Sequence, residues 1–416
     1  MDNVRKDKKD LLRLHDCTIH EGGFRNNWKF DSDTERHIAF VNELAFIGSD
    51  IVDVGVLGNK NKNYGTGYFS SFCKAPDFEK VVNVEYALTL PDFQKIRNQT
   101  IQKVKNIDYI RLVVTQDVSQ DALNEYCLRL KSYGYKILIH LECWQEKNIH
   151  TLLSFVGDLA NCNADMLVID DVHSSYSAEQ MIAILSDLNK KLPQKTGLGC
   201  RMRNAGNQAQ YILEYMVHSL KGRSAAIETS VLGMSRNAAL LELEIAAVYL
   251  NIHNKANYEL TRINSVAAII YKSVKNNISW KTDCVARMLC ENQIAYDYRE
   301  IAQSMQLTIK EMEHMFGKLA VSSRCISDQK QTDGSRCYEI INHYRQKQYR
   351  KKLAVVIWTD RDSEDLLEVY LKEQISNMAQ SGLDIYFCCM IPKSRKSSVV
   401  MEYIRMGIHG IYWLEN

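Results

Sequence analysis

Short apolar segments alternate with amphipathic stretches along residues 11–250 of this 416-residue chain. Residues 33–44 place their apolar side chains at helical spacing, whereas the apolar segments have the length of buried strands. Eight near-equal strand–helix units predict an α/β fold in which a (β/α)8 TIM barrel closes over residues 11–250. An open doubly wound sheet is the alternative, and the near-equal units favour closure. The predicted strands are Leu12–Thr18, Ile51–Leu57, Val84–Leu90, Tyr109–Val114, Ile137–Leu141, Met166–Ile169, Leu198–Met202 and Ala225–Val231.

The pattern changes after residue 250. Residues 251–350 are mainly helical in pattern and predict a helical extension of the barrel. Residues 351–416 then alternate as β-α-β-α-β, which predicts a small C-terminal α/β unit. This unit lacks the G-x-G-x-x-G pattern, so nucleotide binding there has no support. We expect the C-terminal region to serve in docking or in a homodimer interface.

Composition and charge exclude several classes of protein. Apolar residues make up 46% of the chain and charged residues 25%, which are ordinary values for a globular protein. The formal net charge of +2 gives no reason to expect nucleic acid or an acidic membrane as partner. The first ten residues are polar, and no run of 18 apolar residues occurs, so a soluble cytoplasmic protein is expected. The 12 cysteines form no C-x-x-C pair and no Cys/His cluster with zinc spacing, so structural zinc is not expected.

The first predicted strand ends in a specific motif. Residues 16–23 read D-C-T-I-H-E-G-G, which resembles the D-C-T-L-R-D-G-G signature of the DRE-TIM metallolyase superfamily. This superfamily includes HMG-CoA lyase-like and 4-hydroxy-2-oxovalerate aldolase-like barrels. His20 stands where the superfamily has arginine, and Glu21 stands where it has a metal-binding aspartate. The resemblance implies a TIM-barrel lyase and places both departures in the active site.

Weaker similarities follow along the barrel. Residues 53–55 read D-V-G and resemble the family's E-V-G, and Asp170 resembles the aspartate of its V-D-S-x-G segment. Residues 233–238 with Glu244 resemble the family's glycine-rich region after the last strand, although two glycines and an asparagine are replaced. The resemblance covers residues 11–250 and does not extend to the C-terminal region.

The resemblance also implies where a metal would lie, and the residues there do not suit one. The family holds its metal with the aspartate after the first strand and a H-x-H pair at the end of the seventh, whose side chains share a face. With Asn204 aligned to the asparagine that follows this pair, the histidines have become Arg201 and Arg203. Arginine has no lone pair for a metal, so no metal or other cofactor is expected. Glu21 is the one candidate ligand retained, and a hard ion such as Mg²⁺ or Mn²⁺ held with Asp170 or Asp171 is the alternative.

Two hypotheses for the site remain open. Glu21, Arg201 and Arg203 together carry one net positive charge, like an aspartate with two neutral histidines and a divalent cation. The arginines could therefore replace the metal and stabilise an enolate, with His20 as the titratable group. Alternatively, Glu21, Asp170 and the arginines form an internal ion-pair network that only holds the barrel mouth together.

The function expected from these residues is that of an aldolase-like carbon–carbon lyase for a small oxo-acid or related anion. His20, Glu21, Arg201 and Arg203 are the candidate catalytic residues. The candidate substrate-binding residues are Asp170, Asn204 and Arg236. The alternative function is a noncatalytic barrel that binds an anionic metabolite or a protein partner.

Overall fold

We describe the protein from a computed structural model, which divides the chain into two compact units. Unit 1 comprises Met1–Gln306 and Leu319–Gln329, and unit 2 comprises Leu307–Lys318 and Lys330–Asn416. The expected domain boundaries near residues 250 and 350 stay predictions. The structure describes residues 12–23, 28, 33–58, 67–91, 100–115, 118–142, 154–157, 159, 162–172, 174, 176–235, 238–274, 280, 283–292, 294–296, 298–319, 330–349, 352–356, 384–389 and 410–413.

Unit 1 is built on a closed barrel of eight parallel strands. Successive strands pair in chain order, and β1 pairs with both β2 and β9, so the sheet closes on itself. The predicted TIM barrel is confirmed. A short strand, β3 (Tyr68–Phe69), adds to β2 outside the closed ring. The barrel strands are β1 (Leu12–Asp16), β2 (Ile51–Leu57), β4 (Glu85–Leu90), β5 (Tyr109–Val114), β6 (Lys136–Glu142), β7 (Met166–Asp170), β8 (Gly197–Arg201) and β9 (Ala225–Thr229).

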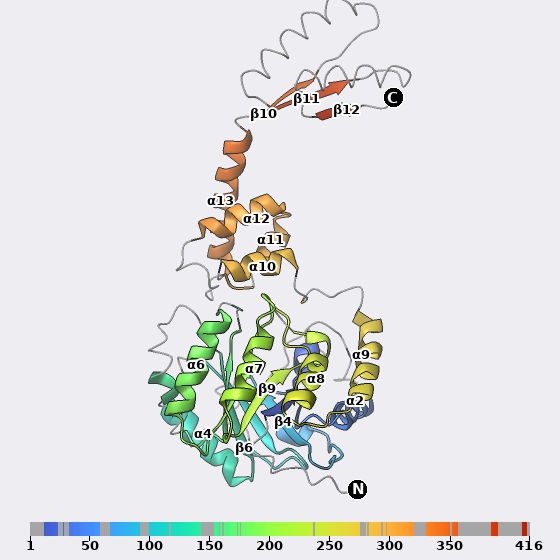
Figure 1. Cartoon of the computed structure of the whole chain (residues 1–416), viewed down its shortest axis with the longest axis vertical. Helices are drawn as coiled ribbons and strands as arrows, with labels where there is room; N and C mark the ends of the chain where they lie inside the picture. The colour runs from blue at the N-terminus through green and yellow to red at the C-terminus, as the bar shows by residue number, and fades with distance from the viewer. Residues whose placement is uncertain are drawn as a thin grey trace, which may run out of the picture. The chain divides into compact units, whose positions relative to one another are not determined.

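Helices surround the barrel strands (Figure 1). Two of them begin at a side-chain cap: Asp33 accepts a hydrogen bond from the backbone N–H of Arg36, and Ser177 and Gln180 form a capping box. Two short 3-10 turns, η2 (Phe72–Lys74) and η3 (Val231–Gly233), lie in the connections. The helices of unit 1 are α1 (Thr18–Gly23), α2 (Thr34–Phe46), α4 (Gln120–Ser132), α6 (Ala178–Lys191), α7 (Ala209–Ser219), α8 (Leu243–His253), α9 (Leu260–Val274), α10 (Cys284–Glu291) and α11 (Tyr298–Ser304).

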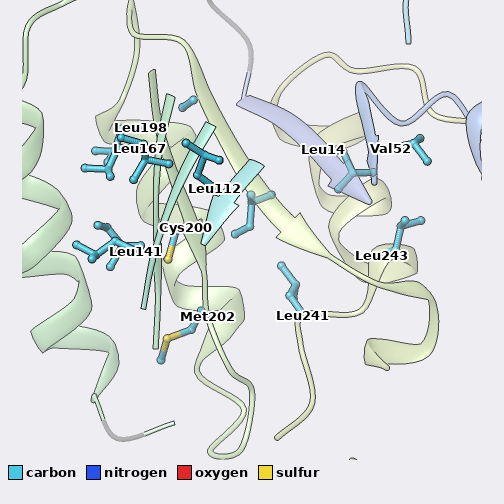
Figure 2. Close-up of a cluster of buried hydrophobic side chains, with 14 of the residues drawn as sticks. Leu14, Val52, Leu112, Leu141, Leu167, Leu198, Cys200, Met202, Leu241 and Leu243 are labelled. Atoms are coloured by element: carbon cyan, nitrogen blue, oxygen red, sulfur yellow. The ribbon is translucent and has the colours of Figure 1, made fainter. Parts of the chain in front are cut away.

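Side chains alternate between two cores along each barrel strand. Leu14, Val52, Leu112 and Leu198 belong to the large cluster between strands and helices, where Cys200 also lies (Figure 2). Cys200 therefore points away from the barrel interior, as strand alternation predicts, and burial raises the pKa of its thiol. A second, smaller cluster fills part of the barrel interior and consists of Ile51, Ala87, Tyr109, Leu138, Met166, Val168 and Ala226.

The described residues of unit 2 form two helices, α12 (Ile309–Lys318) and α13 (Lys330–Tyr349), and the strands β10 (Lys352–Val356), β11 (Asp384–Cys389) and β12 (Gly410–Trp413). The three strands form a parallel sheet in the order β10-β11-β12. Their positions agree with the three strands predicted for the C-terminal unit. The two helices of the predicted β-α-β-α-β pattern fall between these strands, outside the described residues. An ion pair between Arg345 and Glu311 joins α13 to α12, with Nε and Oε1 2.6 Å apart.

No helix in the described part of the chain combines the length and the apolar character needed to cross a membrane.

Candidate functional site

Polar side chains fill the barrel interior toward the carboxyl ends of the strands. Each of the eight strands contributes one of them, and in every case at most 2% of the residue is exposed. The βα loops of a TIM barrel gather at this end, where such barrels carry their active sites. We call this set the polar layer; it consists of His15, Asp53, Thr89, Arg111, His140, Asp170, Arg201 and Glu228.

Glu21 lies directly above the polar layer in helix α1, which follows β1 after one residue. The helix is anchored by Thr18, whose N–H donates to Asp16 at 2.8 Å and whose hydroxyl accepts from the N–H of Val231 at 2.9 Å. The carboxylate of Glu21 accepts hydrogen bonds from Nη1 of Arg201 and from Nη1 of Arg203, the latter at 3.4 Å. The structure thus brings together Glu21, Arg201 and Arg203, the three residues that the motif resemblance places where DRE-TIM barrels hold their metal.

Arg203 follows strand β8 and is held by a second carboxylate. Its Nε donates to Oδ1 of Asp170 at 3.2 Å and its Nη2 to Oδ2 at 2.9 Å, a two-point contact of the kind that guanidinium and carboxylate favour. Its Nη1 also donates to the hydroxyl of Ser235, which in turn donates to Glu21 at 3.1 Å. Arg203 is 3% exposed, so these contacts are largely shielded from water.

The charge of Asp170 depends on these neighbours. Burial alone would raise the pKa of this carboxyl, but Arg203 and the hydrogen bond from His140 outweigh burial and lower the pKa from 3.8 to about 2. His140 lies 3.0 Å from Asp170, measured from Nε2 to Oδ2. Asp170 is therefore ionised throughout the neutral range and stabilises the fold in that form.

The barrel should accordingly lose stability in acid through Asp170. A depressed pKa stabilises the folded state above the unfolded value of 3.8, and this contribution is lost as the pH falls toward about 2. The loss should be about 2 kcal/mol in the free energy of unfolding. Urea unfolding of the wild type and of Asp170→Asn between pH 6 and pH 2 measures it. The stability difference between the two should be constant above about pH 5 and shrink below about pH 4. A difference independent of pH would contradict the assignment.

Arg111 contacts four other members of the polar layer, and no sequence motif pointed to it. Its Nη1 donates to Asp53 at 3.1 Å and to Thr89 at 3.3 Å. Its Nη2 lies 2.8 Å from Nδ1 of His140 and donates to Oε2 of Glu228 at 3.3 Å. Arg111 is fully buried, and through it the β2 side of the barrel is connected to the β9 side.

Arg201 bridges Glu228 and Glu21, and one of its three guanidinium nitrogens has no described partner. Its Nε donates to Oε2 of Glu228 and its Nη1 to Oε1 of Glu21. Its Nη2 is buried and has no hydrogen-bond partner among the described residues. A buried N–H without a partner is costly, which marks this atom as one that a bound ligand could satisfy.

His20 lies at the edge of the network and is 8% exposed. Its Nδ1 is 3.4 Å from Nη1 of Arg111 and 3.9 Å from Oε1 of Glu21. Because a guanidinium can only donate, Nδ1 of His20 is the acceptor and its proton is on Nε2. Burial is the main cause that lowers the pKa of His20 to about 4, so the ring is neutral at pH 7.

Asn204 and Arg236 are the two remaining residues predicted to bind substrate, and only Asn204 is among the described residues. Asn204 begins the segment that leads into α7, where its side-chain oxygen accepts from the N–H of Ala209 at 3.1 Å. Its backbone N–H donates to the carbonyl of Ala239. These contacts give Asn204 a role in shaping the chain, and substrate binding by it stays a prediction. Arg236 lies outside the described residues.

A metal at the family's position does not fit these residues. Arg201 and Arg203 have no lone pairs to donate. Both oxygens of Glu21 already accept hydrogen bonds, one from Arg201 and the other from Arg203 and Ser235. The residues at the position of the family's metal site thus form ion pairs with one another.

Strand alternation marks the members of the polar layer as inward-facing, although it does not say which of them meet. Once the eight strands are aligned, an inward residue near the end of each strand follows from period-two alternation. Glu228 and Arg111 are conspicuous by this criterion, because a charged residue inside a strand of apolar neighbours must have a buried partner. The resemblance to the DRE-TIM motif does not include these two positions.

No protein-family profile matches the sequence, and no curated protein matches it either. Solved structures do resemble the fold. The N-terminal domain of a protein provisionally named an aldolase, from Bacteroides vulgatus, is 17% identical with a TM-score of 0.56, and the match covers 72% of this chain and 98% of that one. HMG-CoA lyase from Bacillus subtilis is 14% identical with a TM-score of 0.52, covering 65% and 96%. The carboxyl transferase domain of Rhizobium etli pyruvate carboxylase, solved with pyruvate, is 11% identical with a TM-score of 0.53, covering 81% and 62%.

At these identities the similarity establishes a shared fold. Two of the three neighbours carry the names of an aldolase and a lyase.

Proposed function

We propose that the protein is a carbon–carbon lyase of the DRE-TIM type that cleaves a small oxo-acid without a metal at the family's usual position. The observation that carries the proposal is the buried Nη2 of Arg201, which lacks a hydrogen-bond partner in the described part of the chain. It belongs to a cation at the position of one of the family's metal-ligating histidines. A donor held there by Glu21 and Glu228 would meet an enolate oxygen without rearrangement.

The position of the proton on the His20 ring favours one of two possible reaction types, decarboxylation, over aldol cleavage. Its Nδ1 accepts from Arg111, so in the neutral ring its second nitrogen carries a proton and cannot remove one. Aldol cleavage needs a base that takes the proton of the substrate hydroxyl, whereas decarboxylation needs none. His20 is therefore better suited to act as a donor than as a base, and this favours a 2-oxo acid with a carboxyl group on C3 as substrate.

The proposed reaction balances with one proton. The bond between C3 and the departing carboxylate breaks, carbon dioxide leaves, and the electron pair moves through C3 and C2 to the carbonyl oxygen. Arg201 Nη2 donates a hydrogen bond to the enolate oxygen that forms. A proton from water then adds to C3 and gives the shorter 2-oxo acid. The organic acid loses one negative charge, and the bicarbonate formed in solution carries that charge.

A noncatalytic barrel is the second candidate. The observation that favours it is the pairing of Arg203. Each of the three nitrogens of its guanidinium group donates to Asp170, Glu21 or Ser235. An ion-pair network of this kind would hold the barrel mouth together whether or not a substrate binds. A small anion or a protein partner would then bind at the mouth without being changed.

Pyruvate formation from oxaloacetate distinguishes the two candidates. The full chain is assayed with chelator present, coupled to lactate dehydrogenase, against a protein-free blank and against a 4-hydroxy-2-oxo acid as second substrate. We expect oxaloacetate cleavage above the blank, unchanged by added Mg²⁺ or Mn²⁺, and little cleavage of the hydroxy-acid. A rate equal to the blank with both substrates would favour the noncatalytic barrel. Stimulation by the added ions would contradict the metal-free mechanism.

A further inference from the structure

Three potential metal ligands meet inside the barrel on the β1–β2 side of the polar layer. His15 belongs to β1, Cys17 follows it directly, and Asp53 belongs to β2. Their ligand atoms all lie within 4.8 Å of one another, and all three residues are buried. His15 and Cys17 are two residues apart and so point to the same face of the chain, while pairing of β1 with β2 brings Asp53 beside them.

The imidazole of His15 is the second observation that points to a ligand. The residue is 0% exposed, and neither of its ring nitrogens has a hydrogen-bond partner in the described part of the structure. Its Nδ1 lies 3.3 Å from Oε1 of Glu228, an oxygen that also has no described hydrogen-bond partner. Metal-bound histidines commonly direct one nitrogen at a carboxylate and bind the ion with the other. With Nδ1 of His15 assigned to the carboxylate of Glu228, Nε2 is the nitrogen left for an ion.

We propose that His15 Nε2, Cys17 Sγ and Asp53 hold a divalent transition-metal ion of the zinc class, separate from the family's metal position. A nitrogen, a sulfur and a carboxylate oxygen form a donor set that suits Zn²⁺, with water in the fourth position. Oδ2 of Asp53 already accepts from Thr89 and Arg111, whereas Oδ1 accepts one described hydrogen bond, from the backbone N–H of Gly55 at 3.1 Å, so Oδ1 is the oxygen assigned to the ion. Zinc–ligand bonds of about 2.0–2.3 Å place tetrahedral ligand atoms roughly 3.3–3.8 Å apart, so the three side chains need to close by about 1 Å. The ion would lie among residues of the polar layer and would support Glu228, which also holds Arg111 and Arg201.

The charges of the described mouth are consistent with an added cation. Three guanidinium groups face four carboxylates, which leaves one net negative charge while the histidines are neutral; these are Arg111, Arg201 and Arg203 against Glu21, Asp53, Asp170 and Glu228. A divalent ion adds two positive charges and releases the thiol proton of Cys17, which adds one negative charge. The sum is then zero.

Burial changes the pKa of both His15 and Cys17, which favours metal binding by His15 and disfavours it by Cys17. Burial lowers the pKa of His15, so the ring is neutral and can bind an ion. Burial also raises the pKa of Cys17, so its thiol is protonated until an ion displaces the proton. Binding should therefore weaken at low pH and release a proton from Cys17.

Sequence spacing could not reveal this site. Zinc motifs are recognised by cysteines and histidines at short fixed intervals, but Asp53 is 36 residues from Cys17 in the chain and joins it only through the β1–β2 pairing. The absence of a C-x-x-C pair excludes the common zinc modules and leaves a site assembled by barrel closure unaffected.

Cobalt substitution tests the proposal on the full chain. The protein is produced in cobalt-supplemented medium, and its metal content and absorption spectrum are measured. We expect about one ion per chain, an intense visible spectrum of four-coordinate Co²⁺, and a thiolate-to-cobalt charge-transfer band. Cys17→Ser should abolish the charge-transfer band. Cys200→Ser is the matched control, because Cys200 is an equally buried barrel cysteine that faces the outer core, and it should leave the band unchanged.

X-ray absorption of the wild-type zinc protein gives an answer even where a variant does not fold. The zinc should have one sulfur neighbour, with nitrogen and oxygen completing the shell. Binding of no zinc or cobalt by the wild type would overturn the proposal. It would also be overturned by an ion without sulfur, such as one held by Glu21, or by a charge-transfer band that survives Cys17→Ser.

Discussion

Replacing Glu228 by glutamine is expected to lower the free energy of unfolding of the barrel by about 3–5 kcal/mol. Glu228 is 0% exposed and contacts Arg111, Arg201 and His140. Burial would raise the pKa of its carboxyl, but Arg111 and Arg201 hold the pKa well below the usual value. Glutamine has nearly the same shape, so the lost stability measures the effect of the missing negative charge. Without it, the buried guanidinium groups of Arg111 and Arg201 lose a carboxylate partner. Urea unfolding at pH 7, with the barrel transition followed by circular dichroism, measures the change.

Glu43→Gln is the matched control. Glu43 pairs with Arg262 at 3.7 Å, but the two side chains are 53% and 46% exposed. The same substitution there should cost less than about 1 kcal/mol, because water screens the charges. If Glu228→Gln also costs less than about 1 kcal/mol, the ion-pair network does not determine the stability of the barrel mouth.

Arg201→Lys is expected to lower kcat for oxo-acid cleavage by about 100-fold or more. Lysine keeps the positive charge between Glu21 and Glu228 but cannot present three nitrogens in fixed directions, so the donor at Nη2 is lost. Initial rates with chelator present, below the unfolding temperature of the variant, measure the effect. The circular dichroism spectrum of the variant must match the wild type for the comparison to count.

Arg223→Lys controls for the loss of a buried arginine. Arg223 is 3% exposed, against 2% for Arg201, and it donates to backbone carbonyls such as those of Thr196 and Leu192. It belongs to the connection before β9 and takes no part in the polar layer, so its replacement should lower stability and leave kcat unchanged. Equal losses of kcat in the two variants would show that Arg201 acts through stability alone.

The barrel strands could be predicted from the sequence, whereas the contacts among the side chains on their inner faces could not. All eight barrel strands were predicted within a few residues of their observed bounds, because buried parallel strands are apolar on both faces and stand out against amphipathic helices. Strand alternation alone also puts Cys200 on the outer face, where it lies. Glu21, Arg201 and Arg203 were found because a family motif drew attention to them.

Arg111, His140 and Glu228 were not found, for a physical reason. Each lies in a different strand and has meaning only through partners on other strands, such as the contact of Arg111 with Glu228. Sequence order says which face of its own strand a residue occupies. The stagger of the barrel decides which residues of different strands reach the same level.

The amino-acid sequence by itself determined the barrel, since strand length, helix spacing and eightfold repetition are local properties. The resemblance of its first motif also predicts that Arg201 and Arg203 stand where DRE-TIM barrels have their metal-binding histidines. Only the tertiary structure decided what the replacements do. Closing β1 against β2 and β9 brings distant charges into one buried layer, where each carboxylate sets the state of its neighbours. The same closure places His15 and Cys17 beside Asp53, which no local pattern could foretell.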